Sequence, residues 1–132
     1  MSRTALALAS TAIAVAVVDL GHKATVDATY FHSRSSGYVV FVVLGAALWA
    51  GTILATGSLS LALAGGIVAG GAIGNLASLA FWPGVPNPLV LEPIAFNLAD
   101  VFVLAGFVLT AAATLVFATR NRERLSEPIR LR

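Results

Sequence analysis

Four long apolar stretches, separated by short polar segments, dominate the hydrophobic pattern of the chain. They cover residues 4–20, 38–55, 59–82 and 96–118. Each stretch approaches the roughly 20 residues with which an α-helix crosses about 30 Å of hydrocarbon. The pattern therefore predicts an all-α membrane protein with four transmembrane helices, folded as a single integral membrane domain over residues 1–132.

The composition supports this class of protein. Hydrophobic residues make up 58% of the 132 residues and charged residues only 11%, whereas a soluble domain carries about a quarter charged residues. The chain has no cysteine, so it can form no disulfide and offers no thiolate ligand for a metal. Its two histidines, His22 and His32, make a weak metal site by themselves, and we expect neither a metal nor a cofactor.

Basic residues gather at the two ends of the chain. Five of the eight Lys and Arg residues lie within the last thirteen residues, and Arg3 lies at the other end. A basic tail directly after a hydrophobic helix, here residues 119–132, is typical of a cytoplasmic anchor and not of nucleic-acid binding. Because an even number of helices separates the two basic ends, the positive-inside rule predicts that both termini are cytoplasmic.

The same topology assigns the connecting segments to the two sides of the membrane. The "TGS" turn at residues 56–58 is then cytoplasmic, and segments 21–37 and 83–95 face the outside. Segment 83–95 contains four of the five prolines of the chain. Proline lacks a backbone N–H and disfavours a helical conformation of the preceding residue, so we expect this segment to be extended and stiff.

Small residues recur every four positions in the third apolar stretch. This spacing places them along one face of a helix. A stripe of small residues allows a neighbouring backbone to approach closely, and such packing is the main attraction between helices in lipid. The stripe therefore predicts a tight helix–helix contact, with a structural role for its members Ala62, Gly66, Gly70, Gly74 and Ser78.

Four polar residues, Asp19, Asn75, Asn97 and Asp100, fall within the predicted helices or at their ends. A charge at the bilayer centre costs at least about 2.5–3.5 kcal/mol, so such residues are candidates for function. Asp19 precedes Lys23 by four residues, a spacing that predicts a structural ion pair at the outer membrane edge. Asn97 and Asp100 have the spacing of a helix cap, and this motif leaves capping and catalysis equally open for Asp100.

Three motifs along the chain together resemble the bacterial lipoprotein signal peptidases, or signal peptidase II. They are "DLGHK" at 19–23, "GGAIGN" at 70–75 and "FNLAD" at 96–100. The resemblance implies a four-helix bundle in the bacterial plasma membrane. It also implies an intramembrane aspartyl protease that cuts a signal peptide just before a lipid-modified cysteine, with two carboxylates sharing one proton.

The chain departs from the family pattern at the carboxylates. The resemblance assigns Asp100 to one catalytic position, but Ser78 stands where the other Asp is expected and Leu79 where an Arg usually follows. The hydroxyl of a serine does not ionise near neutral pH, so it cannot share a proton with Asp100.

Two further departures point the same way. Ser35 or Ser36 replaces the asparagine of an Asn-Gly motif before the second helix. An Asp that follows the third helix in the family aligns near "VPN", which offers Asn87. The scaffold is therefore expected to retain its polar residues without the paired carboxylates.

Two rescues of catalysis are conceivable. Glu92, in the proline-rich segment, could supply the second carboxylate, although a catalytic group needs packed support. Ser78 could act as a nucleophile, but it would need a base, and we expect no Lys or His nearby. Both are weaker than a binding role for the retained polar groups, for which the candidates are Asn75, Asn87, Asn97 and Glu92.

These observations favour a catalytically inactive relative of signal peptidase II. We expect an accessory or binding subunit whose partner is a membrane lipid, a lipidated peptide, a transmembrane helix or a larger membrane complex, and not a nucleic acid. The alternative is an active, divergent lipoprotein signal peptidase. A transporter or channel subunit has less support, because only Asp100 and the asparagines offer a polar path.

Overall fold

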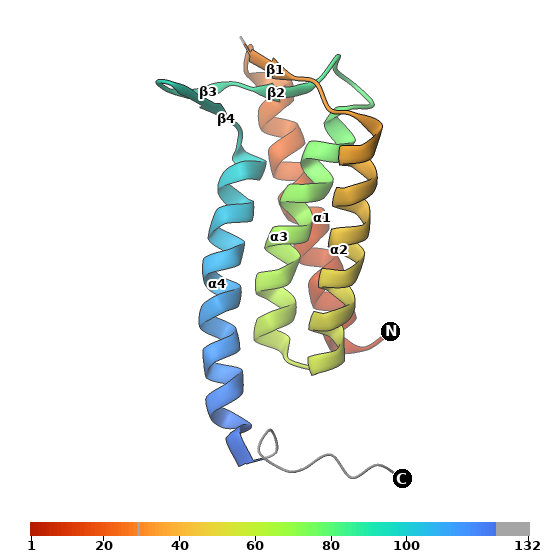
Figure 1. Ribbon diagram of the computed structural model, residues 1–132, viewed down its shortest axis with the longest axis vertical. Coiled ribbons are helices and arrows are strands. Elements are labelled where there is room, and N and C mark those ends of the chain that lie inside the picture. The colour runs from red at the N-terminus through yellow and green to blue at the C-terminus, as the bar shows by residue number, and fades with distance from the viewer. Residues whose placement is uncertain (29, 124–132) are drawn as a thin grey trace.

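The computed structural model describes residues 1–28 and 30–123. Within these ranges the chain forms four helices, α1 (Arg3–Thr25), α2 (Ser36–Thr56), α3 (Leu59–Ser78) and α4 (Leu98–Arg120), shown in Figure 1. All four are long and apolar enough to cross a membrane. The predicted fold class, an all-α membrane protein with four transmembrane helices, is confirmed.

Two helices end several residues from where the hydrophobic pattern predicts. Helix α1 continues past residue 20 to Thr25, so that Lys23 lies inside it together with Asp19. Helix α3 ends at Ser78, four residues before the predicted end, and the backbone N–H of Trp82 turns back to the Ser78 carbonyl. Of the predicted basic tail, residues 124–132 lie outside the described residues.

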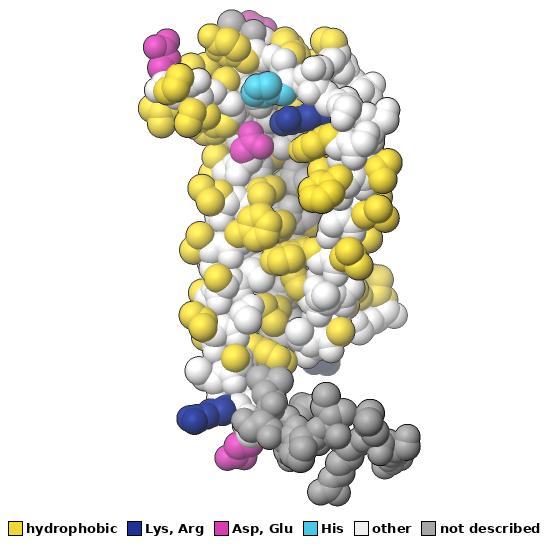
Figure 2. Space-filling model, in the orientation of Figure 1, with side chains coloured by type: hydrophobic (Ala, Val, Ile, Leu, Met, Phe, Trp, Pro, Cys, Tyr) yellow, Lys and Arg dark blue, Asp and Glu magenta, His cyan; other side chains and the backbone are white. Residues whose placement is uncertain are grey.

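Helix α3 is the central helix of the bundle. More than half of its membrane-spanning stretch is buried, whereas the buried share is 17% or less in the other three helices, each of which has an exposed face. Those exposed faces are apolar, as Phe41 on α2 and Leu104 on α4 illustrate. In the view of Figure 2, charged side chains lie near the two ends of the molecule and hydrophobic side chains cover the helices between them. This distribution suits a bundle whose middle is surrounded by lipid.

The small-residue stripe of α3 lies against α1. A Cβ atom added at Gly66 would lie 2.8 Å from the carbonyl oxygen of Leu8, and one at Gly70 would lie 2.6 Å from that of Ala12. Neighbouring Gly71 is equally close to α4, because an added Cβ would lie 2.6 Å from the Ala99 carbonyl oxygen. Any side chain at these positions would push the helices apart, so the glycines set the distances from α3 to α1 and α4.

Short strands form the connections at one end of the bundle. Strand β1 (Tyr30–His32) pairs antiparallel with β2 (Val85–Asn87), and β3 (Leu89–Leu91) pairs with β4 (Ile94–Phe96). Segment 83–95 is thus largely extended, as its prolines predict. Figure 1 shows these strands at one end, which we call the loop end, with the N-terminus and the last turn of α4 at the other. The assignment of the loop end to the outside of the cell stays a prediction.

Candidate functional site

A cluster of polar side chains lies near the loop end, where α1, α3, α4 and β2 meet. Most of its members are almost completely buried, which is expensive unless their polar atoms are paired. Hydrogen bonds connect them across elements that are far apart in the sequence. We call this group the polar cluster; it comprises Asp19, Lys23, Asn75, Ser78, Asn87, Asn97 and Asp100.

Lys23 is the centre of the polar cluster. Its ammonium nitrogen donates to Asp19 Oδ2 at 2.6 Å, to Asn75 Oδ1 at 2.9 Å and to Ser78 Oγ at 3.0 Å. An ammonium group has three N–H donors, so these three oxygens use all of them. The expected ion pair with Asp19 is present, and both of its side chains are buried between helices.

Asp19 connects α1 to α4 as well. Its Oδ2 pairs with Lys23, and its Oδ1 accepts the backbone N–H of Ala99 at 2.8 Å. The N-terminus of a helix has unpaired N–H groups and favours a negative charge nearby. The carboxylate of Asp19 therefore serves both the ammonium of Lys23 and the first turn of α4.

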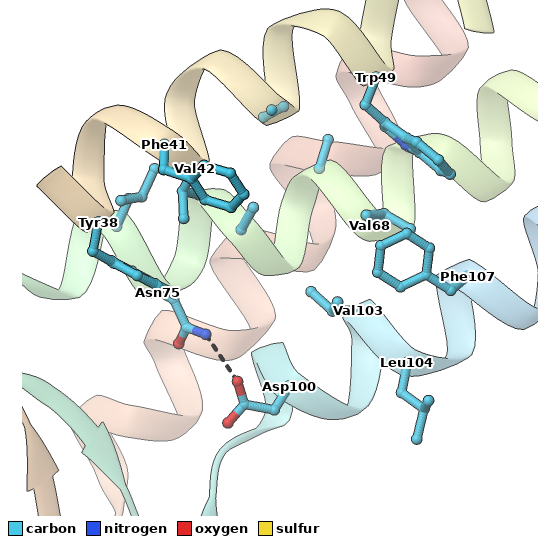
Figure 3. A pocket seen from close by; sticks show the side chains of 15 residues that line it. Tyr38, Phe41, Val42, Trp49, Val68, Asn75, Asp100, Val103, Leu104 and Phe107 are labelled. Carbon is cyan, nitrogen blue, oxygen red and sulfur yellow. Dashed lines mark hydrogen bonds between the residues drawn. The ribbon is translucent and has the colours of Figure 1, made fainter. Parts of the chain in front are cut away.

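Asn97 and Asp100 form the capping box of α4. The Asn97 side chain accepts the Asp100 backbone N–H, and Asp100 Oδ2 accepts the Asn97 backbone N–H, both at 3.1 Å. The other carboxylate oxygen of Asp100 accepts from the Asn75 amide at 3.0 Å (Figure 3). Of the two roles that the sequence left open for Asp100, capping is therefore present. Asp100 is nevertheless exposed, unlike most members of the polar cluster.

A groove of about 640 Å³ opens beside Asp100 between α2, α3 and α4. Asn75 and Asp100 provide polar groups at one end of it, and Tyr38 of α2 lies close by (Figure 3). The remaining lining is largely apolar. Farther along, Trp49 of α2 and Phe107 of α4 meet edge to face, with ring centroids 5.3 Å apart. The groove is thus apolar along most of its length and has a carboxylate at its loop end.

The comparison with protein families matches residues 27–116 to the family described as Signal peptidase (SPase) II. This range covers more than half of the chain and includes the described members of the polar cluster on α3, β2 and α4. The chain belongs to the signal peptidase II family. No curated protein and no solved structure matches it. Family membership agrees with the resemblance carried by the motifs, and with a multi-pass membrane protein.

The sequence predicts no Lys or His near Ser78. That expectation is wrong, because Lys23 lies 3.0 Å from its hydroxyl oxygen. The pair is nevertheless unsuited to nucleophilic catalysis. Ser78 is fully buried and donates its own proton to the Gly74 carbonyl at 2.7 Å, while every N–H of Lys23 already points at an oxygen.

Asn87, the other position where the motif resemblance suggests an Asp, lies beside Asn97. Its Oδ1 accepts from Asn97 Nδ2 at 2.7 Å, and its amide contacts His32 Nδ1. The structure therefore places Asn87 next to Asn97, the N-cap of α4, whose side chain accepts the Asp100 backbone N–H. Ser78 instead lies beside Lys23. Sequence reasoning gave His32 no partner, because its contact with Asn87 depends on the pairing of β1 with β2.

Glu92 lies in the turn between β3 and β4 and is exposed. Figure 1 shows this hairpin pointing sideways, away from the helices. The structure thus does not bring Glu92 to Asp100. Within the described ranges, the carboxylate that the polar cluster holds in addition to Asp100 is Asp19, which is paired with Lys23.

Proposed function

We propose that this member of the signal peptidase II family does not cleave peptides and acts as a binding or accessory subunit in the bacterial plasma membrane. The observation that carries the proposal is the surroundings of Asp100. Its two oxygens accept from the Asn75 amide and the Asn97 backbone, and within residues 1–28 and 30–123 no second carboxylate joins them. Both positions where the motifs suggest a further Asp carry neutral side chains, Ser78 and Asn87.

The chemistry of the family explains why this matters. Two carboxylates divide the work, because the charge of one keeps the other protonated, and the pair then serves as base and acid in one step. Asp19 cannot complete such a pair with Asp100. Its charge is compensated by the Lys23 ammonium at 2.6 Å, and its Oδ1 is held by the Ala99 backbone.

The groove supports a binding role. Its volume falls within the range of about 300–1,000 Å³ that is usual for small-molecule sites. An apolar lining with one carboxylate at the end suits an amphipathic ligand, such as a membrane lipid or a lipidated peptide. A larger membrane complex could use the same scaffold, since the exposed helix faces are free to pack.

The runner-up function is a divergent but active lipoprotein signal peptidase. The observation in its favour is the position of Asp100, which is exposed and lines the groove in which a substrate would lie. It would need a second proton donor from outside the polar cluster.

Complementation separates the two functions. The chain is expressed in a bacterium whose own lipoprotein signal peptidase can be depleted, and the processing of prolipoproteins is followed by gel mobility. We expect unprocessed precursors to accumulate although the protein reaches the membrane. Restored processing that is lost in Asp100→Asn would favour the active peptidase.

A further inference from the structure

Two opposite charges stand unpaired at the loop end of the groove. Asp100 forms no ion pair in the part of the chain that the structure describes. Arg34, just before α2, places its guanidinium carbon 4.6 Å from the ring centre of Tyr38, and Tyr38 lines the groove together with Asp100. Over the same ranges Arg34 has no carboxylate partner either. The mouth of the groove thus offers an anion and a cation to a ligand.

The polar cluster carries more negative than positive charge, and its ion pair does not include Asp100. Lys23 provides one positive charge and Asp19 and Asp100 provide two negative charges, and Lys23 is paired with Asp19. A carboxylate has about four acceptor sites on its two oxygens, and Asp100 uses one on each. An ionisable group in a membrane-spanning helix usually has a functional partner. Here the free acceptor sites fit the N–H donors of a primary ammonium.

The length of the groove fits a single acyl chain. From Tyr38 to Trp49 helix α2 rises by about 16 Å, at about 1.5 Å per residue. This is close to half of the roughly 30 Å hydrocarbon core, which is the depth of one leaflet. The contact between Trp49 and Phe107 then bridges α2 and α4 at the inner end. Because of this bridge, a transmembrane helix cannot run along the groove through the whole membrane.

We propose that the groove binds a phospholipid with a primary ammonium headgroup, taken from the leaflet at the loop end. One acyl chain lies between α2 and α4, the ammonium pairs with Asp100, and the phosphate pairs with Arg34. The proposal deepens the proposed function and rests on it, since the groove holds a resident ligand and not a peptide to be cleaved.

The headgroup assignment is tested by native mass spectrometry of the purified full chain. The protein is offered equal amounts of phosphatidylethanolamine, phosphatidylcholine and phosphatidylglycerol with identical acyl chains. Phosphatidylethanolamine should bind best, because the quaternary ammonium of phosphatidylcholine has no N–H to donate and the headgroup of phosphatidylglycerol carries no cation. We expect Asp100→Asn to lower phosphatidylethanolamine binding about tenfold, the scale of a lost charged hydrogen bond. Arg34→Gln should weaken all three lipids, and Asp27→Asn, an exposed acid outside the groove, should change none.

The acyl-chain assignment is tested with two glycines of α2. Gly45 lines the groove, Gly51 does not, and an added Cβ at either position meets no atom within 4 Å. Gly45→Leu should therefore fill the groove without forcing the helices apart, and should abolish lipid binding. Gly51→Leu is the matched control and should bind like the wild type. Thermal melting in detergent checks that both variants are folded.

Each other outcome overturns part of the proposal. Equal binding of the three lipids, or binding unchanged by Asp100→Asn, would exclude the ammonium site. Equal lipid binding by Gly45→Leu and Gly51→Leu would exclude the groove as the lipid site. A peptide that binds the wild type but not Gly45→Leu would show that a peptide, and not a lipid, occupies the groove. A failure of the proposed function looks different, because it appears as cleavage of a prolipoprotein whatever the lipid preference.

Discussion

The ammonium nitrogen of Lys23 lies 3.0 Å from the hydroxyl oxygen of Ser78, although 55 residues separate them in the sequence. The contact joins the loop-end turns of α1 and α3 inside the bundle. It explains how a neutral residue is accommodated at position 78 beside a buried ammonium group. Since Asp19 already compensates the charge of Lys23, the ammonium needs only a neutral acceptor from α3, and the hydroxyl of Ser78 provides it.

Removal of the Lys23 charge should destabilise the bundle strongly. Lys23→Met leaves the Asp19 carboxylate buried without its counter-ion, and breaking a buried pair in this way costs about 3–5 kcal/mol. The free energy of unfolding can be measured by denaturant titration in detergent micelles. The double variant Asp19→Asn/Lys23→Met is the control and should lose less than Lys23→Met alone. A single variant as stable as the wild type would show that the pair contributes nothing.

Restoration of a second carboxylate should depend on its position. Ser78→Asp places the new group beside Lys23, where an ion pair will hold it away from proton sharing with Asp100. Asn87→Asp places the new carboxylate beside Asn97, the N-cap of α4, which is hydrogen-bonded to the Asp100 backbone. We therefore expect no prolipoprotein cleavage from Ser78→Asp, and measurable cleavage only from Asn87→Asp. The opposite order of activities would mean that Ser78, not Asn87, faces the reacting centre.

Larger side chains at the glycines of the small-residue stripe of α3 should destabilise the bundle, because α1 packs closely against them. An added Cβ at Gly70 would lie 2.6 Å from the Ala12 carbonyl oxygen, and one at Gly74 would lie 2.5 Å from Asp19 Oδ2. Leucine at either position should cost at least the roughly 1–3 kcal/mol that is typical of overpacking. Gly51→Leu is the control, since its Cβ meets no atom within 4 Å. Equal melting temperatures of all three variants would show that the helices adjust freely.

The orientation in the membrane can be tested by cysteine labelling, because the chain has no cysteine of its own. Ser33→Cys lies in the connection at the loop end, and Gly57→Cys lies in the turn at the opposite end. The positive-inside rule predicts that an impermeant thiol reagent added to intact cells labels only position 33. Labelling of position 57 alone would invert the topology.

Local features of the sequence predicted much of this fold. The four apolar stretches, the Asn97 cap, the extended proline-rich segment and the spacing of the glycine stripe each depend on residues that are close in the sequence. The hydrogen bonds of Lys23 to Asn75 and Ser78 span 52 and 55 residues, and they exist only because α1 packs on the stripe of α3. The contact of His32 with Asn87 likewise needs the pairing of β1 with β2. Such contacts carry no local signal.

The groove could not be predicted for the same reason. Its lining alternates along α2, α3 and α4 with side chains that face lipid, and both sets are apolar. The hydrophobic pattern of the sequence therefore cannot distinguish the lining of the groove from a lipid-facing surface. Asn75 and Asp100, the two polar candidates that line it, were the residues that marked its position in the sequence.

The most direct test of the account is cleavage of a diacylated prolipoprotein by the purified full chain in detergent or lipid nanodiscs. Product is quantified against an active lipoprotein signal peptidase and against Asp100→Asn of this chain. We expect no product above the Asp100→Asn background, because a lone carboxylate cannot act as base and acid in one step. Robust cleavage by the wild type that disappears in Asp100→Asn would contradict the non-catalytic function.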